Sequence, residues 1–109
     1  MTDPDETLTI TTRRDAATTV VILSGELDMH SSELLSTALE TVLGGGPDEI
    51  GIDARGLTFT DSAGLRSLLV ARDAADEAGV LLRLTHVSEH LDRLLEITGL
   101  REVLGVPVT

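Results

Sequence analysis

Three kinds of residue are absent or nearly absent from this 109-residue sequence: it has no cysteine, no lysine and one aromatic residue, Phe59. Without cysteine there is no disulfide, no thiolate nucleophile and no cysteine-ligated metal. Without lysine there is no Schiff base and no Walker-type phosphate loop. A single aromatic ring is too few to stack on successive nucleic-acid bases. The core must therefore be built from aliphatic side chains.

Acidic residues are in surplus. The 19 Asp and Glu residues outnumber the 8 Arg residues and give a net charge of −11. Such a chain repels nucleic-acid phosphates and anionic lipid, and suits a partner with a basic surface. The segment Thr2–Glu6 is acidic and polar, unlike a signal peptide, and no apolar run approaches membrane-spanning length. We expect a cytoplasmic protein with no direct nucleic-acid partner and no membrane contact.

The length and the unbroken run of predicted elements indicate a single domain over residues 1–109, with residues 1–6 as a flexible acidic tail. Hydrophobic periodicity and turn residues predict, in order, strand Leu8–Thr11, strand Thr19–Leu23, a helix from Ser31 or Ser32 to Leu43, strand Glu49–Ala54, helix Ser62–Ala78, strand Val80–Leu84, a helix between Ser88 and Gly99, and a last edge strand at Val103–Leu104.

This order predicts an α/β fold. The first two strands are joined by a short link and should pair antiparallel, whereas the later strands are separated by helices and should be parallel. We therefore expect a mixed sheet of four to five strands, with a β-hairpin first, parallel βαβ units after it, and helices packed on the sheet. The β-branched run Thr19–Leu23 is typical of a strand covered on both faces, and Gly25–His30 should form the loop after it.

The segment Leu57–Leu65 holds the most informative chemistry. Asp61 is a good helix N-cap, and Ser62 then occupies the first helical position, beside the positive end of the helix dipole. A phosphate on the Ser62 oxygen would lie where backbone N–H groups point. Local chemistry alone favours an ordinary capping role, because capping is the usual function of these residue types.

Two loops should meet at one edge of the sheet. Gly25–His30 and the Asp61–Ser62 turn each leave the carboxyl end of a parallel strand, and such ends share one edge where functional residues gather. We expect Ser62, Asp28 and His30 to form a surface patch there.

Catalytic and metal-binding interpretations are weaker. His86–His90 matches the H-x-x-E-H zinc pattern, but Ser88 should begin the helix and leave His86 in the preceding loop, so we expect no metal site. A hydrolase triad of Ser62, His30 and Asp28 lacks the G-x-S-x-G elbow. The Gly44–Gly46 run ends a helix and has no lysine after it. We expect a protein that is not an enzyme and has no cofactor.

Two motifs resemble a known family. Gly25-Glu26-Leu27-Asp28 after a buried strand, and Phe59-Thr60-Asp61-Ser62-Ala63-Gly64-Leu65 at a strand-to-helix turn, are similar to the STAS-domain anti-sigma factor antagonists of bacteria. The order of elements agrees along nearly the whole chain. The resemblance implies the STAS fold and reverses the preference for a plain cap at Ser62.

The resemblance also implies a partner switch. The unphosphorylated protein would bind an anti-sigma factor that is also a GHKL-type serine kinase and so release a sigma factor. That kinase would phosphorylate Ser62, and a PP2C-type phosphatase would restore the serine. Because Ala63 stands where many relatives have a second serine, Ser62 is the one acceptor in the motif. The implied partner-binding residues are Gly25, Glu26, Asp28, His30, Thr60, Asp61, Ser62, Ala63 and Gly64.

Two alternatives stay open. The first is a STAS module that binds a partner or small ligand without phosphorylation, as in lipid-transport and anion-transporter relatives. The second is a small enzyme that uses Ser62 or the pair His86 and His90, which a metal analysis and an esterase and phosphatase screen would detect.

Overall fold

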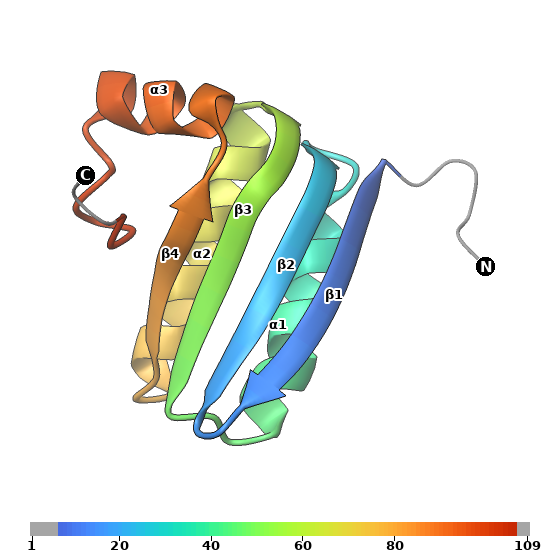
Figure 1. Ribbon diagram of the computed structural model, residues 1–109, viewed down its shortest axis with the longest axis vertical. Helices are drawn as coiled ribbons and strands as arrows, with labels where there is room; N and C mark the ends of the chain where they lie inside the picture. Colours follow the sequence, from blue (N-terminus) through green and yellow to red (C-terminus); the bar gives the residue numbers. More distant parts are fainter. Residues whose placement is uncertain (1–6, 107–109) are drawn as a thin grey trace.

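A mixed four-stranded sheet forms the centre of the computed structural model, which describes residues 7–106 (Figure 1). The elements are β1 (Leu8–Asp15), β2 (Thr18–Leu27), α1 (Ser32–Gly44), β3 (Glu49–Thr60), α2 (Ser62–Glu77), β4 (Leu81–Val87) and α3 (Glu89–Thr98). The strands lie in the order β1-β2-β3-β4, with β1 antiparallel to β2 and the other pairs parallel. The predicted hairpin and parallel βαβ units are confirmed, with four strands in the sheet.

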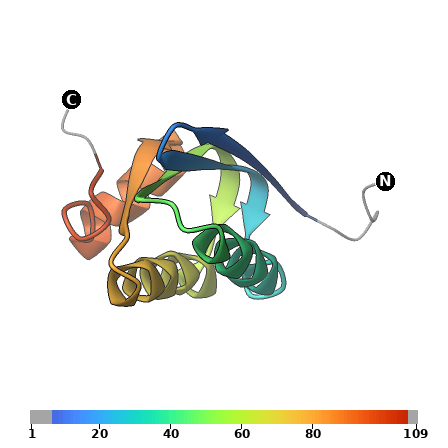
Figure 2. The same ribbon diagram turned by 90° about the horizontal axis from the view of Figure 1, so that it is seen from below.

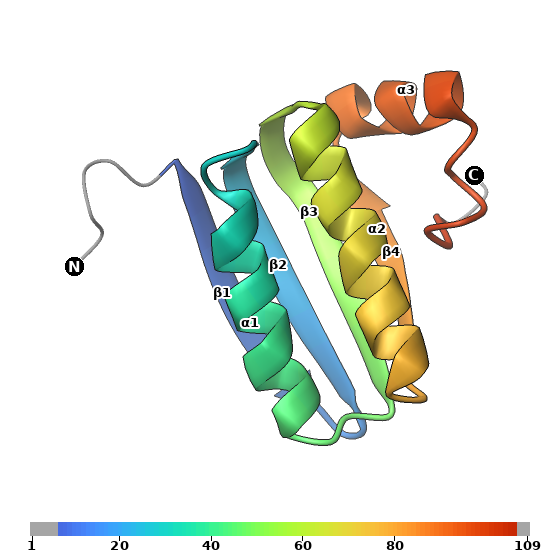
Figure 3. The ribbon, with the colours of Figure 1, turned by 180° about the vertical axis from the view of Figure 1, so that it is seen from behind.

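Both long helices cover the same face of the sheet. Figures 2 and 3 show α1 and α2 side by side on one face of the sheet, in front of the strands in Figure 3, while α3 lies at the end of the sheet near β3 and β4. The core between sheet and helices is aliphatic, as the composition requires; its largest buried side chains are Val21, Leu23, Leu27, Leu35, Ile50, Ile52, Leu57, Leu68, Leu84, Leu91, Leu95 and Leu104. No helix within residues 7–106 has the length and apolar character needed to cross a membrane.

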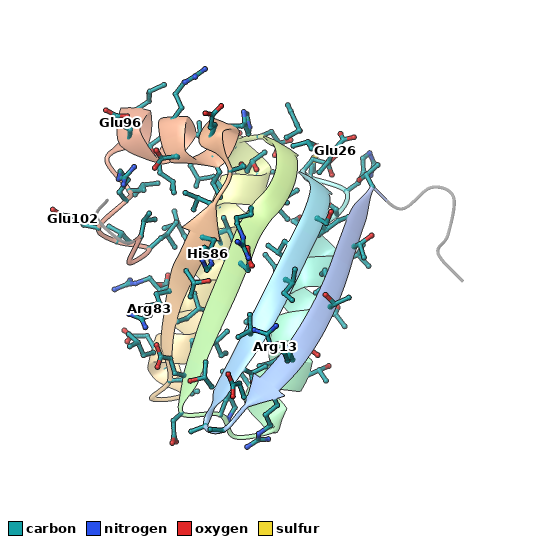
Figure 4. All side chains as sticks on the ribbon, in the orientation of Figure 1. Arg13, Glu26, Arg83, His86, Glu96 and Glu102 are labelled. Atoms are coloured by element: carbon teal, nitrogen blue, oxygen red, sulfur yellow. The ribbon has the colours of Figure 1, made fainter. Side chains whose placement is uncertain are left out.

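The prediction that β2 is covered on both faces is wrong. Val21 and Leu23 are fully buried, but Val20 and Ile22 on the opposite face are only half-buried. The reason is that both crossover helices pack on one side, so β-branched side chains on the other side are shielded only by their neighbours. Figure 4 shows Arg13, Arg83 and His86 on this open face.

All four strands are longer than predicted, and Gly25–Leu27, which were expected to lie in a loop, belong to β2. β2 continues to Leu27 and β3 to Thr60, where Glu26 pairs with Phe59 and Leu27 with Thr60. The ladder passes Gly25 with a shift in register; the φ of Gly25 is +109°, and a Cβ there would lie 2.1 Å from the Thr7 carbonyl oxygen. Tertiary pairing thus overrides the weak strand propensity of this segment.

The C-terminal part of the chain also differs from prediction. Residues 101–105 form turns, so the edge strand predicted at Val103–Leu104 is wrong. Leu104 is instead buried in the core, and its carbonyl oxygen accepts one hydrogen bond of 2.9 Å from the N–H of Leu84. A single bond gives no ladder, and the positive φ of Gly105 turns the chain away. The predicted acidic tail, residues 1–6, lies outside the described residues.

A glycine sets how closely α2 approaches the sheet. Gly64 is buried in the first turn of α2, and a Cβ at this position would lie only 2.0 Å from the Leu27 carbonyl oxygen. Any side chain there would force the helix away from the end of β2. The first turn of α2 therefore touches the backbone of β2, which brings the segments that follow β2 and β3 together.

Gly64→Ala should lower the free energy of unfolding by about 2–3 kcal/mol, because the added methyl group meets backbone atoms that have little freedom to move. Urea unfolding followed by far-UV circular dichroism measures this, since the chain has no Trp or Tyr to report by fluorescence.

Gly44→Ala is the matched control. An added Cβ at Gly44 meets nothing within 4 Å, so this variant should be unchanged or more stable by at most about 1 kcal/mol. Equal stability of the two variants would contradict the close packing of Gly64 against Leu27.

Candidate functional site

The candidate site lies where β2 and β3 end. Leu27 and Thr60 are paired in the ladder, so the loop before α1 and the turn before α2 leave the sheet next to each other, at the same end of the molecule in Figures 1 and 3. The expected meeting of the two loops at one sheet edge is observed. We call this region, formed by residues 25–31 and 59–64, the apical surface.

The loop from β2 to α1 is organised by Asp28. One oxygen of its carboxylate accepts hydrogen bonds from the N–H groups of His30 at 3.0 Å and Ser31 at 2.9 Å. The buried Ser31 hydroxyl lies 3.1 Å from the same oxygen and 2.8 Å from the Glu26 carbonyl oxygen, which it can donate to. Ser31 precedes α1, yet its side chain makes no cap hydrogen bond to the helix because this loop uses it.

These donors change the acidity of Asp28. The backbone N–H of Ser31, followed by the Ser31 hydroxyl and the N–H of His30, stabilises the carboxylate and holds its pKa below the ordinary value. Asp28 therefore stays negatively charged at neutral pH. Its side chain is engaged inside its own loop, so within the described residues it does not orient the ring of His30 as a catalytic triad would require.

The turn from β3 to α2 presents Ser62. The Asp61 carboxylate caps α2 by accepting a hydrogen bond of 2.8 Å from the Gly64 N–H, as predicted. Ser62 is the first residue of α2 and is exposed, and Ala63 beside it is half-buried. Within residues 7–106 the Ser62 hydroxyl makes no hydrogen bond. This hydroxyl is therefore accessible to a second protein at the positive end of a 16-residue helix.

His90 fixes the same turn from the other side. The N–H of Thr60 donates a hydrogen bond of 2.9 Å to Nε2 of His90, and the His90 ring stacks on Phe59 with 6.0 Å between ring centroids. The same Nε2 atom also lies 3.3 Å from the Thr60 carbonyl oxygen. Sequence analysis missed the contact because Thr60 and His90 are far apart in the chain. One feature of the sequence could have indicated this contact: His90 lies in the first turn of the helix that follows β4, at the end of the sheet where Thr60 lies.

Two exposed apolar side chains belong to the apical surface and were not predicted. Met29 in the β2–α1 loop is 69% exposed, and Phe59 at the end of β3 is 44% exposed. Both belong to the residue types that are enriched in protein–protein interfaces. Glu26 and His30 are exposed beside them, and Figure 4 shows Glu26 at this end of the sheet.

The H-x-x-E-H motif is split between two elements. His86 lies in β4, not in a loop as predicted, and its Nδ1 atom is 4.0 Å from the Asp53 carboxylate on the open face. His90 lies in α3 and bonds Thr60. The two rings therefore serve different parts of the molecule.

Comparisons with known proteins agree with this geometry. The family model described as "Mlab, STAS domain" matches residues 10–105. An anti-sigma-B factor antagonist of Bacillus subtilis is 30% identical over 86 residues, which cover 79% of this chain and 78% of the relative. The chain belongs to the STAS-domain family of anti-sigma factor antagonists.

Solved structures share the STAS fold. An anti-sigma factor antagonist from Mycobacterium paratuberculosis superposes with a TM-score of 0.82 at 24% identity, covering all of this chain and 92% of the other. The antagonist SpoIIAA superposes in its unphosphorylated form with a TM-score of 0.74 at 20% identity, covering 92% and 89% of the two chains. SpoIIAA in its phosphorylated form, from Bacillus, gives 0.68 at 22% identity, covering 92% of each chain. The relatives are named for antagonising regulatory proteins rather than for a catalysed reaction.

Asp28→Asn should make the stability of the STAS domain less dependent on pH. The lowered pKa means that the Asp28 carboxylate stabilises the folded state above the ordinary aspartate value of about 3.9 and that this contribution is lost as pH falls through the folded-state pKa. The difference in unfolding free energy between the native chain and Asp28→Asn should therefore be constant near neutral pH and shrink in acid. NMR titration of the Asp28 carboxyl carbon checks the direction directly. In Ser31→Ala the pKa of Asp28 should rise only part of the way toward the ordinary aspartate value, because the backbone N–H donors of residues 30 and 31 remain. A pKa of Asp28 at or above the ordinary value in the native chain would contradict the hydrogen-bonded loop.

His90→Ala should expose the Thr60 amide. Loss of its acceptor should speed hydrogen exchange of this N–H by about tenfold, the effect of one hydrogen bond. His86→Ala removes the other ring of the motif from the open face and should leave the Thr60 amide unchanged. Equal exchange rates in both variants, measured by NMR, would show that His90 does not hold the turn.

Proposed function

We propose that this STAS domain is a phosphorylation-controlled antagonist of an anti-sigma factor. In its unphosphorylated form it binds an anti-sigma factor of the GHKL serine-kinase type, and a sigma factor is released. Phosphorylation of Ser62 ends the binding. The observation that carries this proposal is the exposed Ser62 hydroxyl at the first position of α2, directly beside the β2–α1 loop.

The proposed contact area is the apical surface. It includes the residues implied by the family motifs: Gly25, Glu26, Asp28, His30, Thr60, Asp61, Ser62, Ala63 and Gly64. We add Met29 and Phe59, whose exposed apolar side chains supply contact area. Gly25 and Gly64 act through the backbone, because each allows a close approach that shapes the surface, rather than through a contact of their own.

The local charge supports a switch by electrostatic repulsion. Phosphorylation would add about −1.5 to −2 charges at neutral pH, directly after Asp61 in the chain and on the same surface as the carboxylate of Asp28. In the free domain, solvent and the helix N-terminus accommodate this charge. In a complex the phosphate must lose water and approach other carboxylates. A penalty of about 3 kcal/mol is enough to weaken binding more than a hundredfold.

This switch needs no refolding of the domain. Asp61 caps α2 through Gly64, and His90 holds Thr60, so the acceptor residue is framed by contacts that do not involve its own hydroxyl. A modification at Ser62 therefore changes the charge of the surface and leaves its shape intact. A PP2C-type phosphatase, acting on the same exposed side chain, would reset the protein. We place the whole cycle in the cytoplasm, on a single domain of residues 1–109.

Ser62→Ala should bind the partner throughout growth. Ser62→Asp should bind the partner at least about a hundredfold more weakly, because its carboxylate imitates the charge of the phosphate. Affinity purification from the native host, with mass spectrometry of the bait and of the proteins bound to it, gives the measurement. A GHKL-type kinase should be enriched on the native chain and on Ser62→Ala, and phosphate should be found on Ser62 alone.

Thr41→Asp is the charge-matched control, because Thr41 is exposed near the C-terminal end of α1, away from the apical surface. It should bind like the native chain. Tight binding by the authentic phospho-Ser62 protein would contradict the switch. Unmodified Ser62 under all growth and stress conditions, with no kinase recovered, would favour a STAS module that works without phosphorylation.

A further inference from the structure

A groove runs between α1 and α2 on the side of the molecule away from the open face of the sheet. Figure 3 shows the two helices side by side. The groove has a volume of about 470 Å³. One end is lined by Ser32, the first residue of α1, and by Ala63, the second residue of α2, which directly follows Ser62. The groove therefore starts at the apical surface and extends along both helices.

Each wall of the groove is one face of a helix. On α1 the lining residues Glu33, Ser36, Glu40 and Leu43 recur at helical spacing. On α2 the residues Ala63, Ser67, Val70 and Ala74 do the same. Side chains three or four residues apart lie on the same helix face. Two continuous stripes thus face each other, and the small residues on α2 leave room for an occupant between them.

The floor of the groove is apolar. Leu39 and Ala71 are buried beneath it, whereas Val70 on the wall is 53% exposed. An exposed Val70 beside a concave apolar surface is unfavourable in water and becomes favourable when an apolar group covers it.

Charge on the rim limits what this occupant is. Glu33 and Glu40 are exposed on the α1 side, seven residues apart, and Arg66 is exposed on the α2 side. The two carboxylates and the net charge of −11 repel an anionic lipid or fatty acid. The net charge of −11 also disfavours a second copy of this chain, whose net charge has the same sign. Side chains that complement Glu33 and Glu40 are basic and lie two helical turns apart.

We propose that the α1–α2 groove binds an amphipathic helix of the partner protein, with an apolar face on Leu39 and Val70 and basic side chains one heptad apart facing Glu33 and Glu40. A helix laid in an apolar groove is a common mode of protein recognition. The inference rests on the proposed function for the identity of the partner, the anti-sigma factor. An anti-sigma factor bound in this way would contact the antagonist at two places, the apical surface and the α1–α2 groove.

A model peptide tests the groove without the partner. The probe is a synthetic helical peptide of about 18 residues, with leucines on one face and two lysines one heptad apart at the edge of that face. A second peptide carries glutamates in place of these lysines. Binding to the isotope-labelled native chain is measured by NMR titration at about 0.05 M and about 0.5 M salt. At low salt we expect the lysine peptide to bind at least about tenfold more tightly than the glutamate peptide and to shift the NMR signals of the amides of groove residues. At high salt most of this difference in affinity should be lost.

Variants with matched charge show where the peptide binds. Glu33→Arg/Glu40→Arg should weaken binding of the lysine peptide about tenfold and improve binding of the glutamate peptide. Glu89→Arg/Glu96→Arg makes the same change in net charge on exposed residues of α3 that are also seven positions apart but lie outside the groove, and should change binding less than about twofold. Val70→Asp tests the apolar contact. The fold should tolerate this change because Val70 is half-exposed, and binding of both peptides should weaken.

Several outcomes would overturn the inference. Equal effects of the two charge-reversed double variants would mean that the peptide follows net charge alone. Amide shifts outside the groove would place the peptide elsewhere. Palmitate binding in the groove with displacement of the peptide would assign the groove to an acyl chain, and dimerisation of the native chain lost in Val70→Asp would assign it to a second copy. Failure of the groove leaves the response of Ser62→Ala and Ser62→Asp untouched, and a failed Ser62 switch leaves the peptide result standing.

Discussion

The architecture of the site depends on the contact between Gly64 and the Leu27 carbonyl. Because Gly64 has no Cβ, the first turn of α2 lies against the last residue of β2, a strand to which α2 is not directly connected. The contact places Ser62 of one βα unit beside the loop of the other. The two family motifs, separated by thirty residues in the sequence, meet here as one surface.

Most of the polar groups around this contact make hydrogen bonds within the protein. Asp28 satisfies N–H groups of its own loop, Asp61 satisfies Gly64, and His90 satisfies Thr60. Satisfied groups have little tendency to rearrange, because a new partner would have to replace bonds already made. Two hydroxyls at the apical surface have no partner within the described residues: that of Thr60 is buried, and that of Ser62 is exposed. The site is thus a frame held by internal hydrogen bonds, and it leaves the exposed Ser62 hydroxyl without an internal partner in the described part of the chain.

The sequence was sufficient for features controlled by local chemistry. Asp61 and Ser62 gave the correct start of α2, Ser88 that of α3, and the alternation of elements gave the mixed sheet. Features controlled by distant contacts were wrong or missed. The extension of β2 to Leu27 depends on pairing with β3, and the fate of Leu104 depends on the core beneath it. The β-branched run in β2 could not reveal that both helices pack on one face. The bond between Thr60 and His90 left no periodic signal.

The bond between Thr60 and His90 has a consequence for biosynthesis. It joins residues 30 positions apart, and its acceptor belongs to the last helix of the described chain. A chain leaves the ribosome N-terminus first, and non-local contacts form only once both segments are available. The strand-to-helix turn that carries Ser62 can therefore emerge well before the helix that fixes it. The nascent protein would acquire the finished apical surface only after α3 has emerged, so any molecule that recognises this surface would discriminate against shorter chains.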